Sequence, residues 1–182
     1  MFLLLGLVIA LGLAVTILCL PRASQAELKG IALFAGLGVM AELFALELYG
    51  GSSISLSFVI IFAAALSYGV PGVVAISPLV ALAHAIKFRN VGYKALFNMS
   101  TYALSGSLAA WTFGTFGYNL EARNLLHLLL PTFLATLVNF ALNSGLVATA
   151  IALGTGESPA TVWRERFKWL LGHYLVLGMV GL

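Results

Sequence analysis

Four polar side chains inside apolar stretches of the sequence are candidates for binding a small molecule. They are the carboxylate of Glu42 and the amides of Asn98, Asn139 and Asn143. In an apolar environment each is costly unless it is paired or faces a cavity. Asn139 and Asn143 are four residues apart and therefore share one face of a helix. The alternative use of all four is a structural hydrogen bond between helices, which such side chains often make in membrane proteins.

Three isolated histidines, His84, His127 and His173, are candidate cofactor-binding residues. A single histidine in a membrane protein can hold a haem iron or the magnesium of a chlorophyll. No two of them have the four-residue spacing of a two-histidine motif, and CxxC and HExxH are absent, so no metal site is predicted. The alternative role is that of a polar residue near the membrane surface. The sequence leaves the identity of any cofactor open.

Motifs for catalysis and for nucleic-acid binding are missing from the sequence. It contains no GxSxG elbow, no P-loop and no dinucleotide-binding glycine fingerprint. We therefore expect no enzymatic activity from this chain. Its nine Lys and Arg residues lie in short clusters between apolar runs, without the stripe of positive charge that phosphate binding needs, so a nucleic-acid partner is not expected.

Membrane helices are the elements that must position these side chains. Hydrophobic residues make up 62% of the 182 residues and charged residues only 8%, whereas a soluble domain is about one quarter charged. The composition predicts an all-α, polytopic transmembrane helix bundle that forms one domain over residues 1–182. Its expected location is the cell inner membrane, with the lipid bilayer as its first partner.

Apolar runs separated by short polar segments predict about six spans. The runs cover residues 1–20, 30–49, 54–86, 95–116, 125–153 and the stretch from 170 onward. About twenty apolar residues cross a hydrocarbon core of roughly 30 Å. The first run lacks a positively charged start, so we interpret it as a retained helix and not a signal peptide. The last run stops at Leu182 after about three and a half turns, which suggests a truncated helix.

The run 54–86 is interrupted by the sequence YGVPG at Tyr68–Gly72. As one helix it would be about 50 Å long, too long for the bilayer, and Pro71 between two nearby glycines supplies a break. The break is typical either of a ligand cavity between half-helices or of a tight turn at the membrane surface.

Charge counting then predicts the sidedness of the chain. If the two pieces of the run make one net crossing, eight of the nine basic residues share one side, leaving Arg123 opposite. Lys and Arg favour the cytoplasmic side. The expectation is therefore one crossing plus a re-entrant or interfacial half-helix, an odd number of traversals, and an amino terminus outside the cell.

Three stretches resemble a known class of membrane sensor. They are SLSFVIIFAAALSYGVPGVVAISPLVALAHAI, KALFNMSTYALSGSLAAWTF and WRERFKWLLGHYLVLGMVGL. They are similar to the multi-pass amino-terminal region of bacterial HD-domain phosphohydrolases and diguanylate cyclases. The resemblance spans about residues 54–182 and implies a sensor or anchoring module with a carboxy-terminal output domain as its partner. No HD or GGDEF motif is present, so catalysis does not carry over.

Two other function classes stay open. The GVPG break also resembles the substrate-binding component of energy-coupling-factor transporters, which would make Glu42, Asn98, Asn139 and Asn143 the ligand contacts. The third class is an accessory subunit of a larger membrane complex. Such a subunit would have other membrane subunits as partners and a pigment or haem at a histidine.

Overall fold

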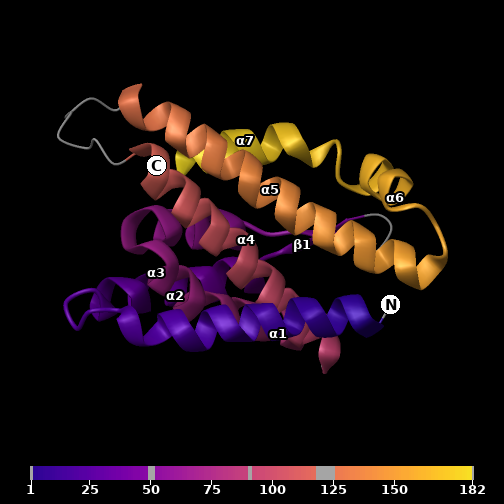
Figure 1. Cartoon of the computed structure of the whole chain (residues 1–182), viewed down its shortest axis with the longest axis horizontal. Helices are drawn as coiled ribbons and strands as arrows, with labels where there is room; N and C mark the ends of the chain where they lie inside the picture. Colours follow the sequence, from indigo (N-terminus) through magenta and orange to yellow (C-terminus); the bar gives the residue numbers. More distant parts are fainter. Residues whose placement is uncertain (1, 49–51, 90–91, 118–125, 182) are drawn as a thin grey trace.

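The computed structural model describes residues 2–48, 52–89, 92–117 and 126–181 as a bundle of helices (Figure 1). The predicted all-α helix bundle is confirmed. Its elements, in order, are the helices α1 (Phe2–Cys19), a 3₁₀ turn η1 (Leu20–Arg22), α2 (Leu28–Leu43), α3 (Ser57–Lys87), α4 (Tyr93–Gly117), α5 (Leu126–Thr155), α6 (Pro159–Arg166) and α7 (Leu170–Val180).

Three helical segments of the described residues are long and apolar enough to cross a membrane. They are Phe2–Arg22, Ser57–Lys87 and His127–Thr155. Helices α2 and α7 are shorter, at 16 and 11 residues. The expected number of about six spans therefore stays a prediction, although the helical bundle itself is established.

The second helix ends earlier than the sequence predicts. It stops at Leu43, and β1 (Leu46–Leu48) then pairs antiparallel with β2 (Ser52–Ile54). The side chain of Lys87 supplies a physical reason, because its ammonium donates hydrogen bonds to the carbonyl oxygens of Leu43 and Ala45. A cation at this position satisfies carbonyls that the end of a helix leaves free.

Helix α3 is broken at Gly69, as the sequence predicts. Gly69 has φ 63° and ψ −152°, a combination that is essentially confined to glycine. Pro71 follows two residues later and its ring would crowd an unbroken helix. The break divides α3 into a first arm, residues 57–68, and a second arm, residues 70–87.

The two arms of α3 run antiparallel, as a helical hairpin. Ser57 in the first arm and His84 in the second both hydrogen-bond to the side chain of Glu42. In a straight helix these two residues would be about 40 Å apart. Near the turn, a Cβ on Gly72 would lie 2.9 Å from the carbonyl oxygen of Ala64. The chain therefore leaves α3 at the end of the bundle where it entered.

This reversal shows that the predicted odd number of traversals is wrong. Tyr68, at the turn, lies against Gly30 at the start of α2, whereas His84 and Lys87 lie at the end of α2. Arg22 and Lys29, which flank the start of α2, are thus at the opposite end from Lys87 and not beside it. Charge counting failed because it carries no information on whether two apolar pieces pack against each other. The expected external amino terminus depended on that count and stays untested; Arg123 lies outside the described residues.

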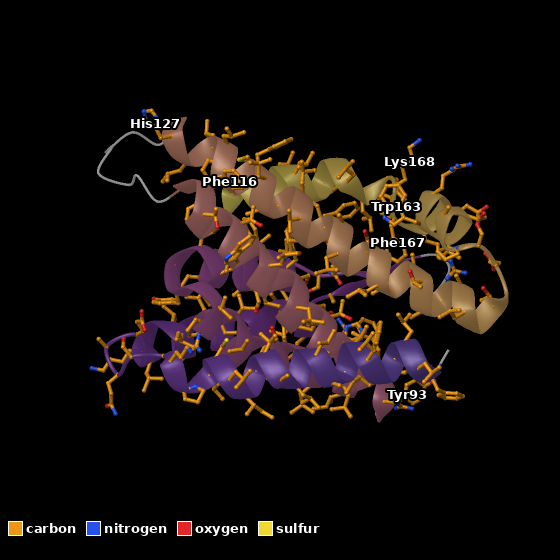
Figure 2. All side chains as sticks on the ribbon, viewed as in Figure 1. Tyr93, Phe116, His127, Trp163, Phe167 and Lys168 are labelled. Carbon is orange, nitrogen blue, oxygen red and sulfur yellow. The ribbon has the colours of Figure 1, made fainter. Side chains whose placement is uncertain are left out.

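The bundle thus has two distinct ends (Figures 1 and 2). The basic end holds the start of α1, both termini of α3, the start of α4 near Tyr93, and α6 with Trp163 and the neighbouring Lys168. The opposite end holds η1, the Gly69 turn, Phe116 near the end of α4, and His127 near the start of α5.

Helix α4 passes between α1 and α5, where small residues allow close packing (Figure 1). Gly12 of α1 lies directly against Ser100 of α4. Several buried hydroxyls, such as those of Ser105 and Thr136, donate to the carbonyl four residues earlier in their own helices. Their hydrogen bonds are thereby satisfied without contributing to contacts between helices.

Candidate ligand cavity

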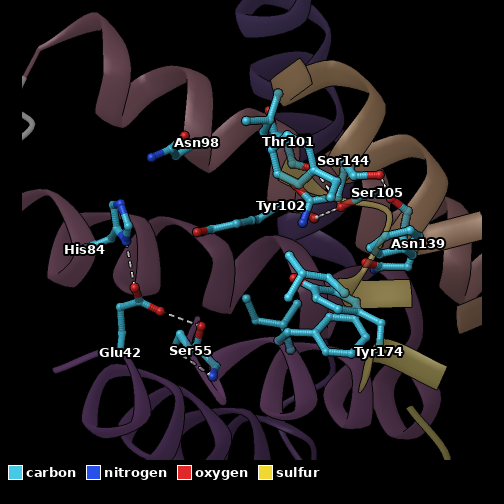
Figure 3. Close-up of a pocket in the computed structure, with 18 of the residues that line it drawn as sticks. Glu42, Ser55, His84, Asn98, Thr101, Tyr102, Ser105, Asn139, Ser144 and Tyr174 are labelled. Carbon is cyan, nitrogen blue, oxygen red and sulfur yellow. Dashed lines mark hydrogen bonds and ion pairs between the residues drawn. The ribbon is translucent and has the colours of Figure 1, made fainter. Parts of the chain in front are cut away.

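A cavity of about 270 Å³ lies between the helices in the half of the bundle next to the basic end (Figure 3). Many of its lining residues lie near that end of their helices, whereas Ser105 and Asn139 lie near the middle of α4 and α5. Glu42 is the second-last residue of α2, His84 lies three residues before the end of α3, and Asn98 is in the second turn of α4. Leu170 is the first residue of α7 and Ile151 lies in the last turns of α5. The cavity is therefore a single polar space shared by five helices and α6.

All four predicted ligand-binding residues line this cavity. Glu42 comes from α2, Asn98 from α4, and Asn139 and Asn143 from α5. The predicted shared face of Asn139 and Asn143 is the face that α5 turns toward the cavity. The structure thus brings together residues that are about a hundred positions apart in the sequence. Their role in binding a ligand stays a prediction.

Glu42 joins α2 to both arms of α3. Its side chain is 1% exposed, and its Oε2 accepts a hydrogen bond of 2.5 Å from the hydroxyl of Ser57. Its Oε1 lies 2.7 Å from Nδ1 of His84. A buried carboxylate is tolerated only when such partners replace water, so this group stabilises the hairpin. The geometry is not that of a nucleophile relay, because Ser57 and His84 contact different oxygens of the carboxylate and not each other.

Several polar groups on the cavity wall have no hydrogen-bond partner within the described part of the chain. The clearest is Oγ1 of Thr101, which is fully buried and unpaired. The side-chain amides of Asn98, Asn139 and Asn143 also make no hydrogen bond to described residues. A buried donor or acceptor left unpaired costs about 1–3 kcal/mol. Groups of this kind gathered around one space are expected to bind water or a ligand that fills it.

Aromatic side chains form an apolar side of the same cavity. The ring centroid of Tyr174 lies 4.2 Å from that of Phe58 and 4.9 Å from that of Phe140. These rings come from α7, α3 and α5, so α7 packs against both α3 and α5 beside the cavity. Pockets for small molecules typically combine such apolar walls with a few placed polar groups.

Helix α6 packs against α5 at the basic end. Ser158 caps its start by accepting a hydrogen bond from the backbone amide of Thr161. The indole of Trp163 donates a hydrogen bond of 2.9 Å to the hydroxyl of Ser144 on α5, and Val162 is fully buried. The polar segment between the last two apolar runs, residues 154–169, thus contains a short helix that is docked on the bundle. Its last residue, Arg166, lines the cavity and is engaged with a neighbouring group.

The three predicted cofactor-binding histidines are not brought together. Only His84 lines the cavity. His127 is exposed at the opposite end (Figure 2), and His173 is exposed with Nδ1 3.4 Å from the carbonyl oxygen of Trp169 in its own helix. Among the described residues, no cluster of three His, Cys, Asp or Glu side chains is placed to hold a metal ion. Cofactor binding by any of them stays a prediction.

Sequence reasoning missed several residues of the site. Ser57, Tyr102 and Tyr174 line the cavity but are ordinary members of apolar segments in the sequence. No spacing rule connects them, because they come from three helices. One weak indication of a site on α4 is present in the sequence. Hydroxyl residues such as Thr101 lie close to Asn98 in the same apolar run.

The fold and cavity define a membrane-embedded helical domain with a small cavity of mixed polar and apolar lining between its helices. No catalytic centre is recognisable among its described residues. This is the form of a membrane sensor or binding domain. The chain belongs to the MASE9 family, which it matches over residues 4–182. MASE domains are membrane-associated sensor domains. No curated protein and no solved structure matches the chain.

Proposed function

We propose that this domain is the ligand-sensing input module of a membrane signalling protein, and that the cavity is its sensory site. The observation that carries the proposal is the convergence of Glu42, Asn98, Asn139 and Asn143 on one cavity in a chain of the MASE9 family. Family membership supports the sensor class. The unpaired amides support a small-molecule signal, which would be passed to an output domain of the kind suggested by the resemblance to HD-domain phosphohydrolases and diguanylate cyclases.

Binding of the signal molecule should stabilise the folded state of the domain. We expect a small-molecule extract of the native host cell to raise the unfolding temperature of the purified domain in detergent by several degrees, because a ligand that binds only the folded state stabilises it by mass action. The substitution Asn139→Leu, which removes a cavity amide, should abolish the rise. Thr112→Val is the matched control, since the Thr112 hydroxyl bonds to the carbonyl of Leu108 in its own helix. No rise with the unmodified domain, or an equal rise with Asn139→Leu, would count against the proposal.

The proposed orientation places the basic end in the cytoplasm. Six of the nine Lys and Arg residues belong to that end: Lys87, Arg89, Lys94, Arg164, Arg166 and Lys168. Arg22 and Lys29 belong to the opposite end. The tendency of basic residues to stay cytoplasmic then places the start of α1 inside the cell, the reverse of the expectation from sequence. The cavity would accordingly sample the cytoplasmic half of the membrane.

Cysteine labelling tests this orientation. In a Cys19→Ser background, Gln25→Cys reports on the opposite end and Ala160→Cys on the basic end; both native residues are exposed. We expect a membrane-impermeant maleimide to label position 25 in intact spheroplasts and position 160 only after permeabilisation. Labelling of position 160 from outside, with position 25 protected, would reverse the proposed sidedness.

A further inference from the structure

The charged groups that line the cavity are already engaged with protein. Both oxygens of the Glu42 carboxylate accept contacts, from Ser57 and from His84. The imidazole of His84 is bound to that carboxylate and also packs on Phe88, with ring centroids 4.6 Å apart. Arg166 has an interaction of its own. An ion entering the cavity would therefore have to compete for a charge that already has a partner.

The hydrogen-bonding capacity that is left over comes from uncharged groups. Asn98, Asn139 and Asn143 each offer an amide that both donates and accepts, and none of the three bonds to a described residue. Thr101 also lines the cavity, but its unpaired hydroxyl is fully buried behind the wall and offers no surface to a ligand. An amide pairs best with a partner that also has both a donor and an acceptor. Figure 3 shows Thr101 and Asn139 on the same side of the cavity, away from the Glu42–His84 pair.

We infer that the cavity takes a small uncharged molecule bearing an amide or a similar donor–acceptor group, with a flat apolar part. The inference deepens the proposed sensory role and rests on it. The three amides hydrogen-bond to the polar group, and the rings of Phe58, Phe140 and Tyr174 contact the apolar part. An uncharged ligand avoids the large cost of transferring an ion into a membrane-embedded space. Glu42 and His84 hold the wall in place and do not bind the ligand by charge.

Three probes of nearly the same shape and different charge test this inference. Benzamide is neutral, benzoate is an anion and benzylamine is a cation, and each is titrated into the domain in nanodiscs while ligand-observed NMR records saturable binding. Empty nanodiscs correct for partition into lipid. We expect benzamide to bind at least about tenfold more tightly than either ion, a factor that corresponds to roughly one unpaired or competing polar contact.

A matched pair of substitutions on α4 separates binding from stability. Asn98→Leu removes a partly exposed amide that lines the cavity, so we expect the domain to keep its unfolding temperature while benzamide binding weakens by about three- to tenfold. Thr112→Val removes a polar group of the same helix that bonds within that helix, and benzamide binding should not change.

The inference is overturned if benzylamine or benzoate binds most tightly, because the cavity would then recognise charge. It is also overturned if none of the three binds saturably, or if Asn98→Leu leaves benzamide binding intact. These outcomes are distinguishable from failure of the proposed function. Stabilisation by the cell extract tests for a signal molecule of any charge, and it would persist if the true ligand were an ion.

Discussion

Replacing Glu42 with alanine is expected to cause a large loss of stability. The carboxylate is 1% exposed and accepts hydrogen bonds from Ser57 and His84. Hydrogen bonds to a charged group contribute about 1.5–3 kcal/mol each, and removal of one member of a buried polar pair leaves the other uncompensated. Glu42→Ala should therefore lower the free energy of unfolding by roughly 3–5 kcal/mol. The measurement is unfolding in mixed micelles with increasing SDS, followed by circular dichroism.

The size of this effect should depend on burial and on the two contacts. Glu157→Ala removes a carboxylate from an exposed site and should change the free energy of unfolding by less than about 0.5 kcal/mol. Glu42→Gln keeps an acceptor for Ser57 or His84 and should fall between the two. If Glu42→Ala unfolded at the same SDS fraction as Glu157→Ala, the contacts of Glu42 with Ser57 and His84 would contribute nothing to stability.

Gly12→Ala is expected to separate α1 from α4. A Cβ at this position would overlap the Cβ of Ser100 and lie 2.5 Å from its Cα. Because one of these atoms belongs to the backbone, a rotamer change cannot relieve the clash and the helices must move apart. Overpacking of this kind costs about 1–3 kcal/mol. The shift would also lengthen the 3.4 Å contact between the Ser100 hydroxyl and the carbonyl oxygen of Ile9.

Gly6→Ala is the matched control on the same helix. No atom lies within 4 Å of the Cβ that would be added at Gly6, so the substitution should be neutral or stabilising by a few tenths of a kcal/mol up to about 1 kcal/mol, as alanine favours helix over glycine. Both variants are compared in the same SDS titration. A Gly12→Ala domain as stable as Gly6→Ala would show that α1 and α4 do not pack as closely as the structure places them.

Composition and local sequence are sufficient to predict the class of fold and one of its breaks. Apolar run length is a local property, so helix formation and membrane association can be predicted from composition. The break at Gly69 was also predictable, because Pro71 and the glycines act on their own stretch of backbone. The shared face of Asn139 and Asn143 follows from the helical repeat alone.

The way these elements meet depends on long-range packing and is visible only in three dimensions. Whether the two pieces of α3 continue in one direction or fold back depends on packing against α2 and α4, which no local pattern encodes. The same packing brings Ser57 and His84 to one carboxylate and leaves the hydroxyl of Thr101 unpaired on a cavity wall. Sidedness follows from that reversal, since it sets which basic residues share an end of the bundle. Contacts between distant segments depend on the shapes of several helices at once, and a single sequence read segment by segment does not specify them.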